Sequence, residues 1–128
     1  MKKILVPCDF SDTAIQAYDF AMNLATKANA EVIVLKVFDL PFLYETGVLK
    51  DIEADAVINF EKMKVRHSRQ EMVSFTTLRG AVTFTINQFA EEHKVDLIVM
   101  GTQGATGLKE YWIGSNTEKV VRYAKVPV

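Results

Sequence analysis

Apolar residues recur along this chain in two alternating patterns, short continuous runs and longer stretches with helical spacing. The runs at 4–6, 32–38, 72–78 and 95–100 are rich in β-branched and aliphatic residues, as in strands buried on both faces. Between them, apolar residues three and four positions apart predict amphipathic helices within 11–29, 49–63, 84–92 and 117–124. Strands that alternate with helices predict an α/β fold, an open parallel sheet with helices on both faces.

Residues that favour chain breaks support these boundaries. Pro7 ends the first run, Ser11 is a good helix N-cap, and Asn29 is a plausible helix stop. Gly80 breaks the third strand. The last four residues, 125–128, have the composition expected at the start of a fifth strand. We therefore expect one domain over 1–128, with the fifth strand largely missing from this chain.

Composition narrows the class of protein. The 128 residues suffice for one domain with a real core. Fifteen basic residues face sixteen acidic ones, so no net field favours nucleic acid or an anionic membrane. The single cysteine, Cys8, cannot form an internal disulfide, and no long apolar span is present. These features predict a cytoplasmic protein with no nucleic-acid or membrane partner.

A glycine series follows the last apolar run and carries the strongest chemical signal. The strand at 95–100 leads into Gly101 and Gly104, and nine residues separate Gly104 from Gly114-Ser115. Asn116 and Thr117 then open the last helix. Glycines allow close approach of backbone N–H groups to a phosphate, and a helix start supplies unpaired donors and partial positive charge. The pattern predicts a site for a nucleotide or another phosphorylated ligand.

Simpler interpretations remain open for several of these residues. Ser115 and Glu118 have capping-box spacing, so Ser115 could cap the helix while the glycines form only a flexible loop. Asp9 could cap the turn before the first helix, and Cys8 is expected to be a buried apolar wall and not a reactive thiol. His67 and His93 lie on polar helix ends, where lone histidines are usually solvated.

Known phosphate fingerprints are absent, since the chain has neither G-x-x-x-x-G-K-[ST] nor G-x-G-x-x-G. What it has is G-x-x-G-x9-G-S, preceded far upstream by Pro7-Cys8-Asp9-Phe10-Ser11. Together with Gly80 and the Asp96–Gly101 run, these motifs resemble the ATP-binding branch of the universal stress protein family, over essentially the whole chain. The resemblance implies the strand order 3-2-1-4-5. In that order strands 1 and 4 are neighbours whose connections leave in opposite directions, which is where open α/β sheets bind ligands.

The resemblance also implies a role for each residue of the motifs. Gly101 and Gly104 would pass under the ribose and the α-phosphate. Gly114, Ser115 and Asn116 would offer backbone N–H groups, and Ser115 its hydroxyl, to the β- and γ-phosphates, and Thr117 next to them is also expected to contact the ligand. Asp9 would lie near the ribose or the adenine edge, and Val37 would hold adenine through its main chain. The apolar walls would be Pro7, Cys8 and Met100. Many family members carry a basic residue where Gln103 stands, so one phosphate counter-charge is missing.

The expected ligand is therefore ATP, or ADP or AMP, with Mg²⁺ or Mn²⁺ held through the phosphates and water. We expect a nucleotide-dependent stress-response or signalling module that forms a homodimer or pairs with a tandem domain. No convincing general base is present, so the protein is not expected to be an enzyme beyond slow ATP turnover. The alternative is an interaction module of the same fold that binds no nucleotide. An adenylate-forming or electron-transfer-flavoprotein-like enzyme ranks last, because Pro7–Ser11 lacks the required S-G-G-x-D loop.

Overall fold

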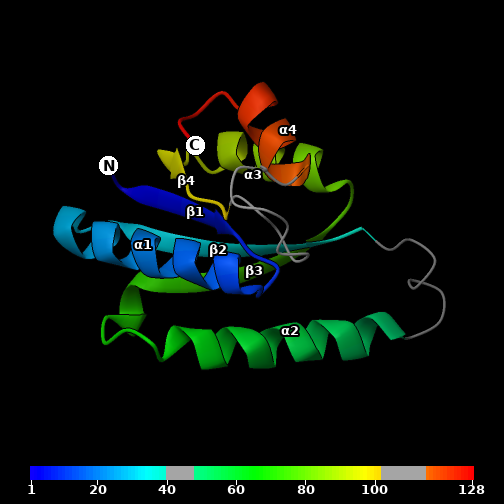
Figure 1. The fold of residues 1–128 in the computed structure, drawn as a ribbon, viewed down its shortest axis with the longest axis horizontal. Helices are drawn as coiled ribbons and strands as arrows, with labels where there is room; N and C mark the ends of the chain where they lie inside the picture. The colour runs from blue at the N-terminus through cyan, green and yellow to red at the C-terminus, as the bar shows by residue number, and fades with distance from the viewer. Residues whose placement is uncertain (40–47, 102–114) are drawn as a thin grey trace.

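A computed structural model describes residues 1–39, 48–101 and 115–128, and in it strands and helices alternate (Figure 1). The strands are β1 (Lys3–Pro7), β2 (Glu31–Phe38), β3 (Val73–Arg79) and β4 (Leu97–Ile98). The helices are α1 (Asp12–Ala28), α2 (Val48–Lys64), α3 (Val82–Glu92) and α4 (Ser115–Tyr123), with a short 3₁₀ turn, η2 (Gln70–Met72), before β3.

The strands form one parallel sheet in the order β3-β2-β1-β4. Ile4 of β1 is paired with Val32 of β2 on one side and with Leu97 of β4 on the other. β1 is thus a central strand, and the first and fourth strands are neighbours. The predicted fold class and strand order are confirmed.

Successive side chains of the central strands enter two separate cores. Ile4 and Val6 pack on the face covered by α1 and α2, whereas Leu5 packs on the face covered by α3 and α4. Figure 1 shows these two helix pairs on opposite sides of the sheet. Burial on both faces explains the continuous apolar runs, and each fully buried aliphatic side chain contributes about 1.5–3 kcal/mol.

The predicted breaks have clear structural causes. The Ser11 hydroxyl accepts a hydrogen bond from the Ala14 N–H at 3.3 Å and so caps α1. Asn29 ends the same helix in the left-handed conformation, with φ of 54°. Gly80 has φ of 145°, a conformation that side chains rarely adopt, and an added Cβ would lie 2.7 Å from Thr85 Oγ1.

The first three strands differ from the predicted ranges by one residue at one or both ends, and the fourth strand is much shorter than predicted. The fourth strand covers Leu97–Ile98 and not 95–100, although the Asp96 and Val99 N–H groups still donate to β1 carbonyl oxygens at 2.9 Å. β4 is an edge strand of the described sheet, so no further strand is paired with its outer side there. On that side the Ile98 N–H donates a 2.9 Å hydrogen bond to the Pro127 carbonyl oxygen. The third strand begins at Val73 because Met72 belongs to η2.

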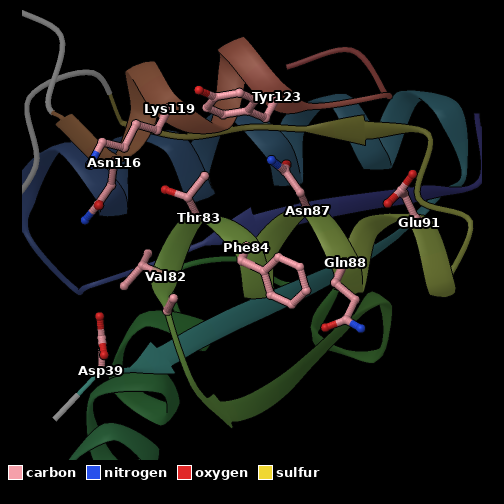
Figure 2. Close-up of a pocket in the computed structure, with 11 residues that line it drawn as sticks. Asp39, Val82, Thr83, Phe84, Asn87, Gln88, Glu91, Asn116, Lys119 and Tyr123 are labelled. Atoms are coloured by element: carbon pink, nitrogen blue, oxygen red, sulfur yellow. The ribbon is translucent and has the colours of Figure 1, made fainter. Parts of the chain in front are cut away.

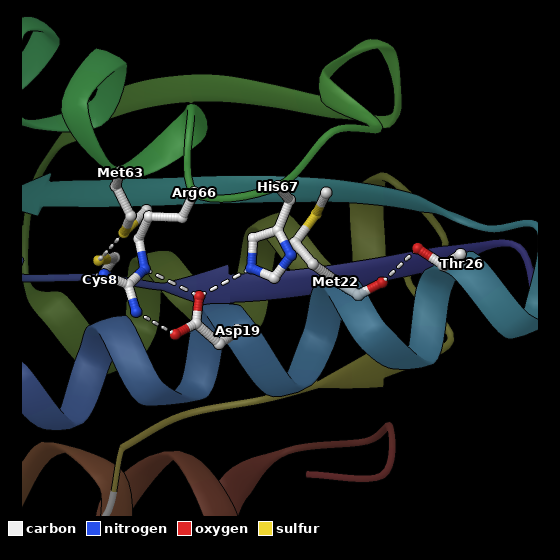
Figure 3. A network of polar contacts seen from close by, with 7 residues as sticks. All are labelled: Cys8, Asp19, Met22, Thr26, Met63, Arg66 and His67. Carbon is white, nitrogen blue, oxygen red and sulfur yellow. Dashed lines mark hydrogen bonds and ion pairs between the residues drawn. The ribbon is translucent and has the colours of Figure 1, made fainter.

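The expectation that His67 is solvated was wrong. Its side chain is 20% exposed, and its Nε2 lies 2.7 Å from Asp19 Oδ1 on α1. Arg66 adds two bonds to the same carboxylate, from Nε at 3.0 Å and from Nη2 at 2.6 Å (Figure 3). The Tyr18 ring meets the His67 ring edge to face at 5.4 Å. This cluster ties the segment that follows α2 to α1. His93 is exposed, as expected, and stacks on Phe89.

Candidate functional site

The carboxyl ends of three neighbouring strands bring the predicted site residues together. Beyond Pro7, the last residue of β1, the Cys8 N–H donates to the Leu35 carbonyl oxygen of β2 at 2.9 Å. On the other side Leu5 pairs with Ile98, and the same register continued by two residues puts Met100 beside Pro7. Residues from positions 7, 37 and 100 therefore reach the same edge of the sheet.

Cys8 is buried at this edge, and its role as an apolar wall of a ligand site stays a prediction. Its side chain is 6% exposed, its Sγ lies 4.0 Å from Met63 Sδ, and it accepts a hydrogen bond from the Phe10 N–H at 3.4 Å. Burial raises the pKa of the Cys8 thiol to about 11. The thiol is neutral at physiological pH, which agrees with the sequence-based expectation.

Asp9 forms the turn that leads into α1, as the simpler interpretation anticipated. Its Oδ1 accepts a hydrogen bond from the Ser11 N–H at 3.0 Å, across Phe10 in the left-handed conformation with φ of 63°. The residue is exposed, and this is the only hydrogen bond that its carboxylate makes within the described ranges. One oxygen therefore remains open to solvent or to a ligand.

Val37 and Met100 lie on the face of the sheet that α3 and α4 cover. Val37 is 9% exposed and pairs with Leu78 of β3, while Met100 is partly buried against the same core. The Val37 side chain is committed to packing. A contact with adenine would therefore use its main chain, which stays a prediction.

Gly101 is held between the first turns of two helices. A Cβ at Gly101 would lie 3.0 Å from the carbonyl carbon, carbonyl oxygen and Oγ1 of Thr13 on α1. From the other side, the Thr117 hydroxyl of α4 donates a 2.7 Å hydrogen bond to the Gly101 carbonyl oxygen. Thr117 is 8% exposed. Its hydroxyl is engaged with the chain itself, so a ligand contact of Thr117 would use its main chain and stays a prediction.

The structure describes only some of the remaining predicted site residues. Gln103, Gly104 and Gly114 lie outside the described residues, as does the side chain of Ser115, the first residue of α4. Asn116 is exposed on the first turn of α4. Glu118 pairs with Arg122 one turn later, so its carboxylate is partly neutralised. The capping box of Ser115 and Glu118 stays a prediction.

A groove between α3 and α4 was not anticipated from the sequence (Figure 2). Its volume is about 800 Å³. Asn116 is the only predicted ligand contact, among those the structure describes, that lines it. The lining residues come from the end of β2 and from both helices: Asp39, Ala81, Val82, Thr83, Phe84, Asn87, Gln88, Glu91, Asn116, Lys119 and Tyr123. Phe84 and Tyr123 gave the only sequence signal, as aromatic residues on otherwise polar helix faces.

Two absences hold for the described ranges, 1–39, 48–101 and 115–128. No three His, Cys, Asp or Glu side chains there are grouped so that they could hold a metal ion. No helix there is long and apolar enough to span a membrane.

Comparison with known proteins identifies the family. The model of the universal stress protein family matches residues 1–128. The chain belongs to the universal stress protein family. Proteins of this family are generally stress-response proteins without enzymatic activity.

Individual universal stress proteins match over nearly the whole chain. Universal stress protein MJ0531 of Methanocaldococcus jannaschii is 36% identical over 137 residues, which covers 99% of this chain and 79% of the relative. The solved structure of MJ0577 from the same organism superimposes with a TM-score of 0.87 at 33% identity, covering 99% of this chain and 92% of the other. A universal stress protein solved in complex with cAMP shares the fold, with a TM-score of 0.73 at 24% identity, over 99% and 93% of the two chains.

Proposed function

We propose that the carboxyl edge of β1, β2 and β4 binds an adenine nucleotide and that the bound state regulates a stress-response signalling module. The observation that carries this proposal is the meeting of Cys8-Asp9, Val37 and Met100-Gly101 at one edge. The helices that follow β1 and β4 lie on opposite faces of the sheet (Figure 1). Ligands of open α/β sheets bind at such a point.

The residues at this edge fit the base and the sugar of a nucleotide. Pro7, Cys8 and Met100 would be the apolar walls around adenine, and the neutral thiol of Cys8 adds no charge there. The main chain of Val37 would satisfy polar atoms of the base. The Asp9 carboxylate, with one oxygen open, would accept a hydrogen bond from a ribose hydroxyl.

The phosphates would lie at the first turn of α4, where backbone N–H groups lack partners within the helix. The segment from Gln103-Gly104 to Gly114-Ser115 and the exposed Asn116 amide would supply the donors. Because Arg122 pairs with Glu118, the one carboxylate in this turn repels a phosphate less. The proposed ligand is ATP, or ADP or AMP, with Mg²⁺ or Mn²⁺ held through phosphates and water.

We also propose that the protein is cytoplasmic and acts as a homodimer or together with a tandem domain. An interaction module of this fold without a nucleotide is the second candidate. The observation that favours it is the Thr117 hydroxyl, which is engaged by Gly101 and so is not available to a phosphate. The uncharged Gln103 points the same way.

Mass spectrometry of the supernatant from heat-denatured protein distinguishes the two candidates. The nucleotide proposal expects bound ATP, ADP or AMP, or calorimetric heat when Mg-ATP is added to the purified chain. Titrations with cAMP and with AMP then show whether the triphosphate is required. Absence of both a co-purified nucleotide and calorimetric heat would leave only the interaction module.

A pair of matched variants tests where the phosphates lie. Asn116→Asp puts a negative charge at the first turn of α4, and we expect it to weaken ATP binding by about tenfold. Asn23→Asp makes the same change on an exposed position of α1 and should leave affinity unchanged. Gly114→Asp should abolish binding while the chain stays folded. Equal ATP affinities for all these variants and the natural chain would refute the assignment.

A further inference from the structure

The groove between α3 and α4 has the dimensions of a ligand site, and of its lining residues the nucleotide proposal uses only Asn116. Its volume of about 800 Å³ falls within the roughly 300–1,000 Å³ of small-molecule pockets. It extends from Asp39, just past β2, along the first three turns of α3 to Tyr123 of α4 (Figure 2). The Cys8, Val37 and Gly101 edge does not line it.

Two aromatic rings stand in the groove, one from each helix. Phe84 is 67% exposed and Tyr123 is 65% exposed, although each ring could bury a large apolar area. Exposed aromatic residues gathered in a hollow commonly mark a binding site. A planar ring that enters the groove would cover both of them.

Two polar side chains of the groove, Asn87 and Lys119, have no partner among the described residues. Asn87, which lies between the two rings in Figure 2, forms no hydrogen bond within the described part, and its Oδ1 is buried. Because no hydrogen bond fixes the orientation of this amide, either its oxygen or its nitrogen can face a ligand. The exposed Lys119 makes no ion pair with any described residue, whereas Glu91 is paired with Lys125 at 3.2 Å.

The charges select the class of ligand. Lys119 provides one positive charge for one acidic group. The carboxylates of Asp39 and Glu91 also line the groove, and although Glu91 is paired with Lys125, they oppose a ligand with several negative charges. A single carboxylate therefore fits the groove better than a triphosphate does.

We propose that the α3–α4 groove binds a small aromatic monocarboxylic acid. The ring lies against Phe84 and Tyr123, a polar substituent on the ring bonds the Asn87 amide, and the carboxylate pairs with Lys119. Among the described residues this site shares only Asn116 with the proposed nucleotide site, and it can exist whether or not ATP binds.

Amide NMR titrations with 4-hydroxybenzoate and 4-hydroxyphenylacetate test the proposal. We expect shifts concentrated in 82–91 and 116–123, with a dissociation constant on the order of 1 mM for one or both acids. Phenol lacks the carboxylate and cyclohexanecarboxylate lacks the ring, so each should bind about tenfold more weakly. Phe84→Ala and Lys119→Gln alter exposed side chains and should each weaken the acids by about tenfold. Lys27→Gln, on the exposed end of α1, is the matched control and should change nothing.

Three results would overturn the proposal. One is the absence of shifts with either acid at about 10 mM, which would mean that the groove holds only water and does not bind such acids. Another is equal binding of cyclohexanecarboxylate or equal affinity of Lys119→Gln, because the ring or the charge would then play no part. The third is competition between Mg-ATP and the acids with the same shifted residues, which would make the groove part of the nucleotide site. A chain that binds the acids but not ATP would refute only the proposed function.

Discussion

The Thr117 hydroxyl donates a 2.7 Å hydrogen bond to the Gly101 carbonyl oxygen and so joins the start of α4 to the end of β4. Thr13 of α1 contacts the other side of Gly101, with backbone and side-chain atoms 3.0 Å from where a Cβ would be. The first turns of α1 and α4, from opposite faces of the sheet, therefore converge on one glycine. The position of the proposed phosphate donors depends on this junction.

Replacing Thr117 by Val keeps the branched shape and removes the hydroxyl. Because Thr117 is buried and the Gly101 carbonyl loses its donor, we expect a loss of about 1–2 kcal/mol of stability in urea unfolding. If nucleotide binds as proposed, affinity should fall as well, since α4 is no longer held against Gly101.

Thr117→Ser is the matched control, because it keeps the hydroxyl and loses only a methyl group. It should retain ATP affinity even where stability falls slightly. A Thr117→Val chain as stable as the natural one would show that this bond adds nothing to the fold.

Gly101→Ala should destabilise the chain by about 1–3 kcal/mol through overpacking against Thr13. The double variant with Thr13→Ala should recover only part of this loss, because the new Cβ still meets the Thr13 carbonyl group. Chemical unfolding of the four chains of this cycle gives the coupling. Full recovery in the double variant would mean that only the Thr13 hydroxyl restricts the site.

Acid stability should depend on Asp19. Hydrogen bonds from Arg66, and then from His67, hold the pKa of the Asp19 carboxyl below its usual range, against the opposing effect of partial burial. A lowered folded pKa gives stability that is present above the unfolded value of about 3.9 and is lost as pH falls below it. The stability gap between the natural chain and Asp19→Asn should therefore be constant near neutral pH and shrink toward about pH 3. Urea unfolding at several pH values measures this gap.

Asp55→Asn is the control for that series, because Asp55 is exposed on α2 and makes no ion pair within the described ranges. Its stability should track that of the natural chain at every pH. A gap for Asp19→Asn that stays constant down to pH 3 would contradict a lowered pKa at Asp19.

Sequence patterns predicted the features that depend on local burial and backbone conformation. Alternation of strands and helices was enough for the α/β class, and Ser11 and Asn29 cap α1 as expected because capping depends on neighbours within a turn. The strand order came from the family resemblance and was also correct.

Contacts between distant residues were beyond the same patterns. His67 meets Asp19 across 48 positions, and Thr117 meets Gly101 across 16, so no local spacing indicates either bond. β4 covers only Leu97–Ile98 because it lies at the edge of the described sheet, although the apolar run 95–100 predicts a longer strand. The α3–α4 groove likewise arises from the packing of two helices, and in their separate sequences only Phe84 and Tyr123, aromatic residues on polar faces, indicate it.

Cys8 should react slowly with a thiol reagent such as DTNB in the folded chain. With a pKa of about 11, only about one Cys8 thiol in 1,000 is ionised at pH 8, against roughly one in four for an unfolded cysteine. Burial under α1 and beside Met63 restricts access further. The reaction in native buffer should therefore be at least about 100-fold slower than in urea at a concentration that unfolds the chain. Equal rates in the two solutions would contradict the burial and the raised pKa of Cys8.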